Sequence, residues 1–278
     1  MSISLSEYVA FYGEEHFDLS MEALRFFTQF GSSEFAIRPF LARELSRTLA
    51  IMTTWADDEN EHVRRLASEG SRPRLPWSFQ IKPLIEDPTP VAPILDRLKN
   101  DPSLYVRKSV ANHLNDITRD HPEWVLDRLG GWPIDNPHTA WIAKHALRSL
   151  IKKGDPKALT VVGASGKPLV EVTSFGVSPS KIALGQRLQI DGRIASTSDA
   201  SQRLVVDYAV HYVKKNGAAN RKVFKLKQVD LAPYASWDIS ISQVVRDFTT
   251  RKHHAGHHRV ELLVNGESIA ESGFDLSI

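Results

Sequence analysis

The sequence contains no cysteine, which excludes a disulfide framework, a thiolate metal site and a cysteine nucleophile. This absence suits a reducing compartment, and we expect a cytoplasmic protein. No stretch approaches the roughly 18 apolar residues of a membrane span, and the first residues lack the basic start and apolar run of a secretory signal. We therefore expect a soluble protein that has no membrane partner.

The net charge of the chain is also small. The formal charge of +2 is too small to indicate nucleic-acid binding by itself, so an electrostatic argument depends on where the charges lie. A chain of 278 residues with ordinary apolar and charged fractions can bury a sizeable core, and its length predicts two domains.

Three segments of the first half share one pattern. Each places a helix-starting Asp or Asn before an apolar-basic pair, with apolar anchors at Val63, Val106 and Ile142. The anchors are 43 and 36 residues apart, which fits two-helix repeats of the HEAT type. The spacing predicts a HEAT-like α-helical solenoid over residues 1–165.

The apolar period changes from helical to alternating near residue 168. The alternation is typical of β-strands, and Asn216-Gly217 and Asn265-Gly266 are hairpin turn signals. About seven short strands predict an immunoglobulin-like β-sandwich over residues 170–278, with a core of aliphatic side chains, Phe and Trp237. The clearest alternating segments are 188–194, 204–213 and 223–229.

Aromatic residues crowd the first forty positions, although a terminal repeat needs a polar outer face. Two interpretations stay open: an aromatic-rich cap, or an edge that further N-terminal helices or a partner cover. The residues are Phe11, Phe17, Phe26, Phe27, Phe30, Phe35 and Phe40.

The repeat register predicts a ladder of mostly basic residues on one surface of the solenoid. Such a ladder can neutralise backbone phosphates, although surface charges on helices are often only solvated. The segment 71–77 adds Arg72, Arg74 and Trp77 beside it. The equivalent positions are Arg65, Lys108 and Lys144, then Glu69, Asn112 and Arg148, then Pro73, Asp116 and Lys152.

Two carboxylates, Glu69 and Asp116, interrupt this basic ladder. Each repels phosphate, so their presence indicates a cationic ligand or transition state. Cleavage of a glycosidic bond develops positive charge on the sugar, which a prepositioned anion stabilises. The alternative is that each carboxylate pairs with a nearby arginine.

Segments 55–77, 101–124 and 141–157 resemble the AlkC branch of the HEAT-like-repeat DNA alkylation repair glycosylases. The most specific piece is 61–77, EHVRRLASEGSRPRLPW. One group of AlkC proteins carries an immunoglobulin-like domain after the solenoid, so the resemblance spans essentially the whole chain. Family members have additional helices before the segment that begins here, and we expect an N-terminally shortened version.

The resemblance implies a lesion site at Glu34, Glu69, Trp77 and Asp116, and bases alkylated at ring nitrogens, such as 3-methyladenine and 3-methylcytosine, as substrates. These bases are cationic, so the leaving group is already activated. We expect Asp116 to stabilise the sugar cation and to position or deprotonate water, Glu69 to reinforce the negative field, and Trp77 to lie against the deoxyribose or base. No amine nucleophile is evident, which predicts a monofunctional glycosylase that does not cleave the strand. We also expect a monomer that requires no metal or cofactor.

The partner implied is double-stranded DNA, bent over the ladder. Basic residues outnumber acidic ones by three over 171–278, so the sandwich should help to hold DNA through 214–217 and 251–254. The histidines of 253–258 lack the spacing of a metal site. The expected DNA contacts are Arg65, Arg72, Arg74, Lys108, Asn112, Lys144, Arg148, Lys152, Lys214, Lys215, Arg251 and Lys252.

Two other functions stay open. One is a non-catalytic adaptor, in which the solenoid binds a protein and the carboxylates form structural ion pairs. The other is a relative that recognises damaged DNA without removing the base.

Overall fold

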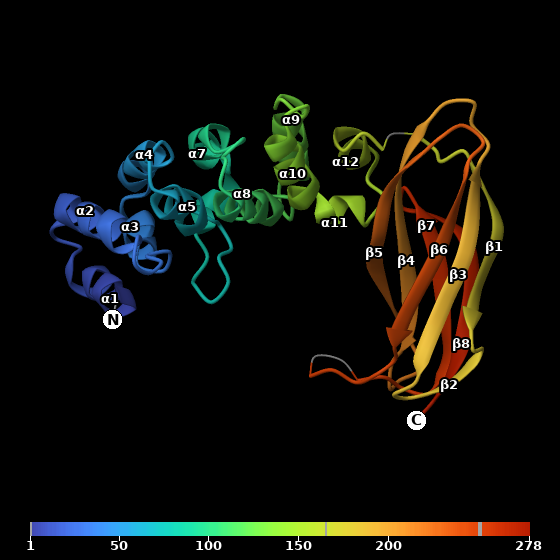
Figure 1. Ribbon diagram of the computed structural model, residues 1–278. Coiled ribbons are helices and arrows are strands. Elements are labelled where there is room, and N and C mark those ends of the chain that lie inside the picture. Colours follow the sequence, from blue (N-terminus) through green and yellow to red (C-terminus); the bar gives the residue numbers. More distant parts are fainter. Residues whose placement is uncertain (1, 165, 250–251) are drawn as a thin grey trace. The chain divides into compact units, whose positions relative to one another are not determined.

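The computed structural model describes residues 2–164, 166–249 and 252–278. They form two compact units, which divide between Ser149 and Leu150. Helices build the first unit and β-strands dominate the second, which is the predicted fold class (Figure 1). Within the described ranges, no helix is both long and apolar enough to cross a bilayer.

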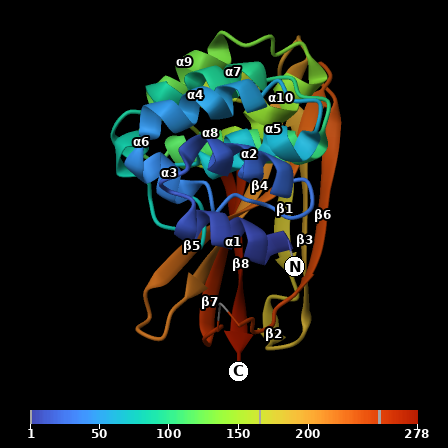
Figure 2. The ribbon, with the colours of Figure 1, turned by 90° about the vertical axis from the view of Figure 1, so that its left-hand side faces the viewer.

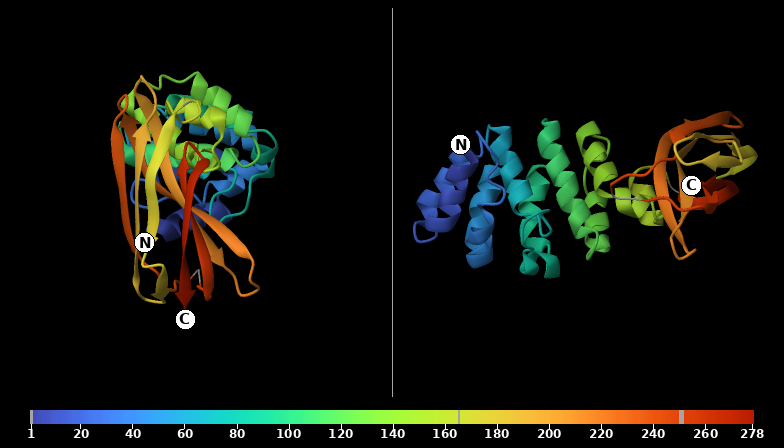
Figure 3. Two further views of the ribbon diagram at one scale, coloured as in Figure 1. Left: turned by 90° about the vertical axis from the view of Figure 1, so that its right-hand side faces the viewer. Right: turned by 90° about the horizontal axis from the view of Figure 1, so that it is seen from below.

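The helices of the first unit lie in two layers. Figures 1 and 2 show α4, α7 and α9 in one layer and α5 and α8 in the other, and Figure 3 shows successive helices side by side when viewed from below. This is the arrangement of helical repeats. The elements are α1 (Ser2–Tyr12), α2 (Phe17–Phe27), α3 (Arg38–Arg43), α4 (Leu45–Trp55), α5 (Glu61–Gly70), α6 (Lys82–Glu86), η1 (Thr89–Val91), α7 (Ala92–Arg97), α8 (Leu104–Ile117), α9 (Pro122–Gly130) and α10 (Pro137–Ala146).

The predicted anchors explain how the repeats pack. Val63 in α5, Val106 in α8 and Ile142 in α10 are all fully buried, and α8 packs against both α5 and α10. The side chain of Asn136 caps α10 by accepting the His138 N–H at 2.9 Å. The repeat pattern therefore predicts the buried face of these helices and, for α10, also the capping residue.

The second unit is a sandwich of two sheets. A three-stranded sheet has the order β1-β3-β6, and a five-stranded sheet has the order β2-β8-β7-β4-β5. All pairings are antiparallel except β2 with β8. The strands are β1 (Val170–Ser178), β2 (Lys181–Ala183), β3 (Arg187–Ser196), β4 (Gln202–Val213), β5 (Ala219–Leu231), β6 (Ser236–Val244), β7 (Gly256–Val264) and β8 (Glu267–Ser277).

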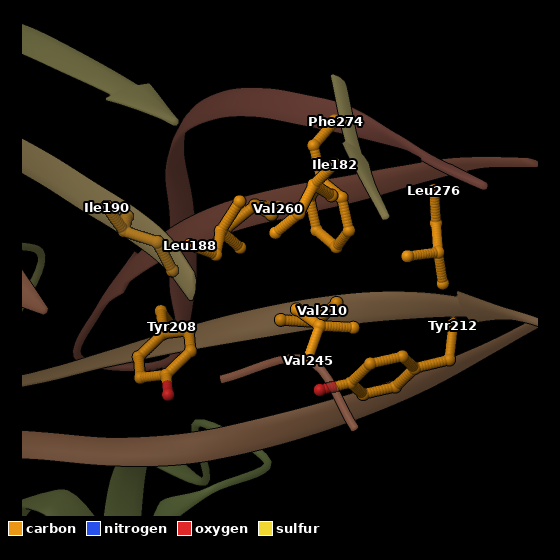
Figure 4. Close-up of a cluster of buried hydrophobic side chains, with 10 residues drawn as sticks. All are labelled: Ile182, Leu188, Ile190, Tyr208, Val210, Tyr212, Val245, Val260, Phe274 and Leu276. Atoms are coloured by element: carbon orange, nitrogen blue, oxygen red, sulfur yellow. The ribbon is translucent and has the colours of Figure 1, made fainter. Parts of the chain in front are cut away.

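Apolar side chains from both sheets fill the sandwich. Figure 4 shows one cluster, in which Leu188 and Ile190 of β3 face Tyr208 and Val210 of β4. Trp237 is half-buried against a second cluster, as the expected core required. Both predicted turn dipeptides lie in hairpins, between β4 and β5 and between β7 and β8.

Helices give way to strands between Val161 and Val170, near the predicted change of period, and residues 150–164 belong to the compact unit that contains the sandwich. This segment includes α11 (Arg148–Ile151), which crosses the division, and α12 (Pro156–Val161). Gln228 Nε2 of β5 donates a hydrogen bond to the Val162 carbonyl at 3.2 Å. Helical periodicity cannot reveal that a helix packs on strands, because the packing partner is distant in sequence.

The phenylalanines of the first forty residues divide by burial. Phe17 and Phe40 are buried, with ring centroids 6.0 Å apart. Phe27 is half-buried, so only part of the cluster contributes to a core. The exposed members are Phe11, Phe26, Phe30 and Phe35.

Candidate active site

Glu69 is a buried carboxylate in the last turn of α5, with its side chain 8% exposed. Its Oε1 accepts a hydrogen bond from Arg72 Nη1 at 2.6 Å. Its Oε2 accepts another from Ser109 Oγ of α8, also at 2.6 Å. Both carboxylate oxygens of Glu69 are therefore held by hydrogen bonds. One donor lies in the loop that follows α5, and the other lies in the adjoining repeat.

Asp116 lies near the end of α8, and its Oδ2 accepts a hydrogen bond from Arg72 Nε at 2.8 Å. Arg72 thus connects the two carboxylates that the ladder predicted. Burial raises the pKa of Asp116, Arg72 opposes this rise, and the net pKa is higher than usual. Burial alone would lower the pKa of Arg72, but Asp116 and Glu69 raise it, so Arg72 remains cationic.

Glu34 extends this cluster on the other side of Glu69. Its Oε2 accepts hydrogen bonds from Arg65 Nη1 at 2.6 Å and from Ser32 Oγ at 2.8 Å. Arg65 Nη2 also lies 3.8 Å from Glu69 Oε1. We call Glu34, Arg65, Glu69, Arg72 and Asp116 the carboxylate cluster.

The contacts in the cluster bear on the alternative interpretation, in which each carboxylate only pairs with a nearby arginine. Glu69 and Asp116 do pair with an arginine, as that alternative expected. However, the five residues of the cluster include three carboxylates and only two guanidinium groups, and Arg38, Arg119 and Arg148 balance this charge through their electrostatic interaction with Asp116. No described residue donates a hydrogen bond to Oδ1 of Asp116. This oxygen is therefore available to accept one from a ligand.

Trp77 lies in the loop of residues 71–81 that follows α5. This loop projects from the α5 and α8 layer, away from α4 and α7 (Figure 1). The Trp77 side chain is 97% exposed, and its φ of +63° is in the left-handed region. The ring contributes almost nothing to the core and is open to a ligand.

The predicted DNA-contacting residues of the first unit fall into three groups: ion-paired arginines, the half-buried Lys144, and residues that line a hollow. Arg65 and Arg72 belong to the carboxylate cluster, and Arg74 binds Asp120 through two hydrogen bonds of 3.0 Å. Lys144 is half-buried in α10. The others line a hollow of about 340 Å³ between α8, α10 and the start of α11, formed by Lys108, Ala111, Asn112, Trp141, His145 and Arg148.

The second unit brings together two predicted lysines. Lys214 and Lys252 line a hollow of about 100 Å³, together with Tyr212, Asn220 and His254. Lys215 is exposed at the adjacent hairpin tip, and Lys152 also belongs to this unit. Arg251 lies outside the described residues. Among the described residues, no three His, Cys, Asp or Glu side chains form a group that could hold a metal ion.

Sequence reasoning missed two residues that shape the cluster. Ser109 is buried within the apolar stripe of α8, where a small polar residue could have signalled a polar partner. Arg38 is fully buried within the apolar run 36–41, and it donates hydrogen bonds to the loop that carries Trp77. A single arginine in such a run is the available signal.

Comparison with known proteins places these features in a family. Residues 26–150 match the model of the DNA alkylation repair enzyme, and residues 171–278 match the C-terminal Ig-like domain of the uncharacterised protein YhaZ. The chain is 43% identical over 265 residues to the uncharacterised protein YhaZ of Bacillus subtilis (strain 168), covering 95% of this chain and 74% of that protein.

A solved structure gives the same result. The chain is 56% identical to the Pseudomonas fluorescens alkylpurine DNA glycosylase AlkC bound to DNA containing an abasic site analog, with a TM-score of 0.95. The match covers 100% of this chain and 77% of that chain. This chain belongs to the AlkC branch of the DNA alkylation repair glycosylases. The resemblance found in the sequence is confirmed, and the carboxylate cluster of this AlkC chain lies within the alkylation-repair match.

Proposed function

We propose that this chain hydrolyses the N-glycosidic bond of cationic N-alkylated bases, such as 3-methyladenine and 3-methylcytosine, in double-stranded DNA. The observation that carries this proposal is the carboxylate cluster, in which adjoining repeats bring Glu34, Glu69 and Asp116 together and leave one Asp116 oxygen without a hydrogen bond. The similarity to a glycosylase bound to DNA supports DNA as the partner.

The proposed reaction needs an anion more than an acid. When the bond between the sugar and the base breaks, the base leaves with the electron pair and loses its positive charge. The sugar becomes cationic, and water adds to it and releases a proton. Asp116 stabilises the sugar cation and accepts that proton, and its raised pKa makes it a stronger base than an exposed aspartate.

Arg72 has a different role from the phosphate contact that its sequence position indicated. Its guanidinium is 8% exposed and occupied by Glu69 and Asp116. We assign it to keeping the buried Asp116 ionised, because its hydrogen bond and charge lower the pKa of that carboxyl. Glu69, held by Arg72 and Ser109, adds to the negative field.

Trp77 supplies a π-face for the cationic base or the sugar. Such contacts contribute roughly 0.5–2 kcal/mol. The exposure of the ring leaves its face accessible without any rearrangement of the core. In this proposal Glu34 acts through Arg65, which it holds beside Glu69.

DNA binding is assigned to the remaining basic residues. Lys108 and Asn112 contact phosphates from α8, Lys144 from α10 and Arg148 from α11, and Lys214, Lys215 and Lys252 do so from the sandwich. The enzyme is proposed to be monofunctional and monomeric and to act without metal or cofactor. Bending of DNA over the helices exposes the sugar to the carboxylates.

The substitution Asp116→Asn tests the proposal. The amide keeps the shape of the side chain but removes the anion and the base, so release of 3-methylcytosine from duplex DNA should fall roughly 10²–10⁴-fold. Asp127→Asn, at an exposed position of α9, is the matched control and should retain the wild-type rate. Normal base release by the Asp116→Asn enzyme would refute the assignment, and wild-type protein that binds but never releases the base would indicate a damage-recognition protein.

A further inference from the structure

Arg38 lies at the start of α3 and has no exposed surface. Its Nη1 donates hydrogen bonds to the carbonyl oxygens of Gly70 at 3.0 Å and Arg72 at 2.8 Å, and its Nη2 donates to that of Phe79 at 2.5 Å. The guanidinium carbon also lies 5.4 Å from the centroid of the Phe79 ring. One side chain thus contacts the end of α5 and both limbs of the loop 71–81.

This arrangement is costly for folding. Burial, followed by the charge of Arg72, lowers the pKa of Arg38 to about 10, and its Nε is buried without a hydrogen-bond partner. No carboxylate forms an ion pair with Arg38 within the described ranges. A buried cation of this kind is destabilising relative to an apolar side chain of similar size. Packing alone therefore gives no reason for an arginine here.

The three acceptors explain the choice. The Gly70 carbonyl is at the C-terminal end of α5, where a cation interacts favourably with the helix dipole. The Arg72 and Phe79 carbonyls lie on opposite limbs of the loop, so the planar guanidinium holds the limbs together. A backbone hydrogen bond from Ile81 N–H to the Pro73 carbonyl, at 3.1 Å, closes the same limbs.

Two hydrogen bonds from Arg74 to Asp120 and the buried Leu75 also hold the near limb of the loop, and Arg38 adds a contact that joins this limb to the far one. Trp77 is almost fully exposed and has a positive φ, a conformation that non-glycine residues adopt at a cost and that surrounding structure must maintain. The near limb also carries Arg72, whose side chain binds Glu69 and Asp116. The base of the loop therefore determines the position of the aromatic ring relative to the carboxylate cluster.

We propose that Arg38 is a positioning residue for base release, which fixes the loop 71–81 and so sets the position of the Trp77 ring relative to the carboxylate cluster. The inference rests on the proposed function, because it assigns Arg38 an effect that passes through Trp77. Arg38 itself touches neither DNA nor the reacting atoms.

Hydrogen exchange of the 278-residue protein tests whether Arg38 holds the loop 71–81 in place. In the wild type, the amide of Ile81 should exchange as slowly as the amides of α5, because Arg38 joins the two segments. In Arg38→Lys, whose ammonium cannot reach three carbonyls in one plane, exchange at Ile81 should be at least tenfold faster. A wild-type loop that exchanges much faster than α5 would refute the inference, even if the variant failed to fold.

Arg107→Lys is the matched control. Arg107 also donates to two backbone carbonyls, of Asp101 at 2.8 Å and Pro102 at 2.7 Å, and also has a buried Nε without a partner. Its acceptors precede α8 and do not include the loop 71–81. This variant should leave both exchange at Ile81 and the rate of base release within twofold of the wild type.

A double-mutant cycle tests whether Arg38 affects base release through Trp77. Single-turnover release of 3-methylcytosine is measured for the wild type, Arg38→Lys, Trp77→Ala and the double variant. Arg38→Lys should slow the wild type at least tenfold but slow Trp77→Ala less than twofold, because the ring that Arg38 positions is already absent. Equal losses in both backgrounds would reduce Arg38 to a purely structural role.

These experiments distinguish a failure of the proposed function from a failure of the inference about Arg38. If the wild type released no base, the proposed function would fail while exchange at Ile81 still decided whether Arg38 holds the loop. If the wild type were active and the exchange or the cycle gave the contrary result, the inference alone would fail.

Discussion

Asp116 shows how a single residue acquires reactivity from opposing effects. Burial raises its pKa, while the hydrogen bond and charge of Arg72 lower it. The carboxyl can therefore remain ionised and still be more basic than an exposed aspartate. The balance depends on Arg72 more than on any other nearby cation.

Removal of the Arg72 charge should move the acidic limb of the pH–rate profile. A base must be ionised to act, and Arg72→Gln removes an effect that lowers the pKa of Asp116. The pKa should then rise further, and the acidic limb should shift to higher pH by roughly 1–3 units. Arg119→Gln removes a weaker effect of the same sign and should give a smaller shift. An unchanged limb in Arg72→Gln would exclude Asp116 as the base.

His113 should make the free energy of unfolding decrease as the pH falls. It is fully buried beneath the cluster, and burial together with the Arg72 charge lowers its pKa from 6.5 to about 3. The unfolded chain therefore binds the proton first as the pH falls. Stability that is present above pH 6.5 should be lost toward pH 3, on the order of 1 kcal/mol per pH unit.

His113→Leu should flatten this dependence, as measured by urea unfolding between pH 4 and pH 7. His16→Gln changes an exposed histidine in the same unit and should leave the slope unaltered. A slope in His113→Leu equal to that of the wild type would show that other groups control acid stability.

At the scale of elements, close backbone approach positions the segment around α12 in its unit. Gly154 and Gly266 approach so closely that a Cβ built on Gly266 would lie 2.1 Å from the Gly154 Cα. Gly266 also has a φ of +81°, which the hairpin between β7 and β8 requires. The second glycine of the turn signal thus serves two purposes, of which the sequence showed only the turn.

Two glycine substitutions separate these purposes. Gly217→Ala in the hairpin between β4 and β5 meets open space at a φ of +79°, so only backbone strain should destabilise it, by roughly 1–2 kcal/mol. Gly266→Ala adds a clash with Gly154, and its total loss should exceed that of Gly217→Ala by roughly 1–3 kcal/mol. Urea unfolding measures both. Equal losses would mean that the contact adjusts freely.

For the whole molecule, charge is distributed unevenly between helices and sandwich. The overall charge is only +2, yet the helical unit gathers three carboxylates in one cluster and the sandwich has the excess of basic residues. In the proposed function, the first unit supplies the anionic chemistry and both units supply phosphate contacts. Charge reversal in the sandwich should therefore affect DNA affinity and its salt dependence.

Lys214→Glu should weaken DNA binding at low salt and reduce the slope of log K against log salt by about 1 for the lost phosphate contact. Lys181→Glu is the control, since Lys181 lies in β2, at the opposite edge of the five-stranded sheet from β5. Binding isotherms at several salt concentrations give both slopes. Identical slopes for the two variants would show that the Lys214 tip makes no phosphate contact.

The sequence by itself determined the helices, the strands and their order. Helical spacing around Val63, Val106 and Ile142 and alternation in the second half are local signals, because burial of one face imposes a fixed period on each element. The same register placed Glu69 and Asp116 on adjacent repeats, and the structure joins them through Arg72.

Only the tertiary structure decided which charges meet. The sequence could not show that Arg72 faces carboxylates rather than phosphate, that Ser109 holds Glu69, or that Arg38 supports the loop of Trp77. These contacts join residues more than thirty positions apart, except for the short link from Arg72 to Glu69. Their energies depend on burial and distance, which a periodic pattern does not specify.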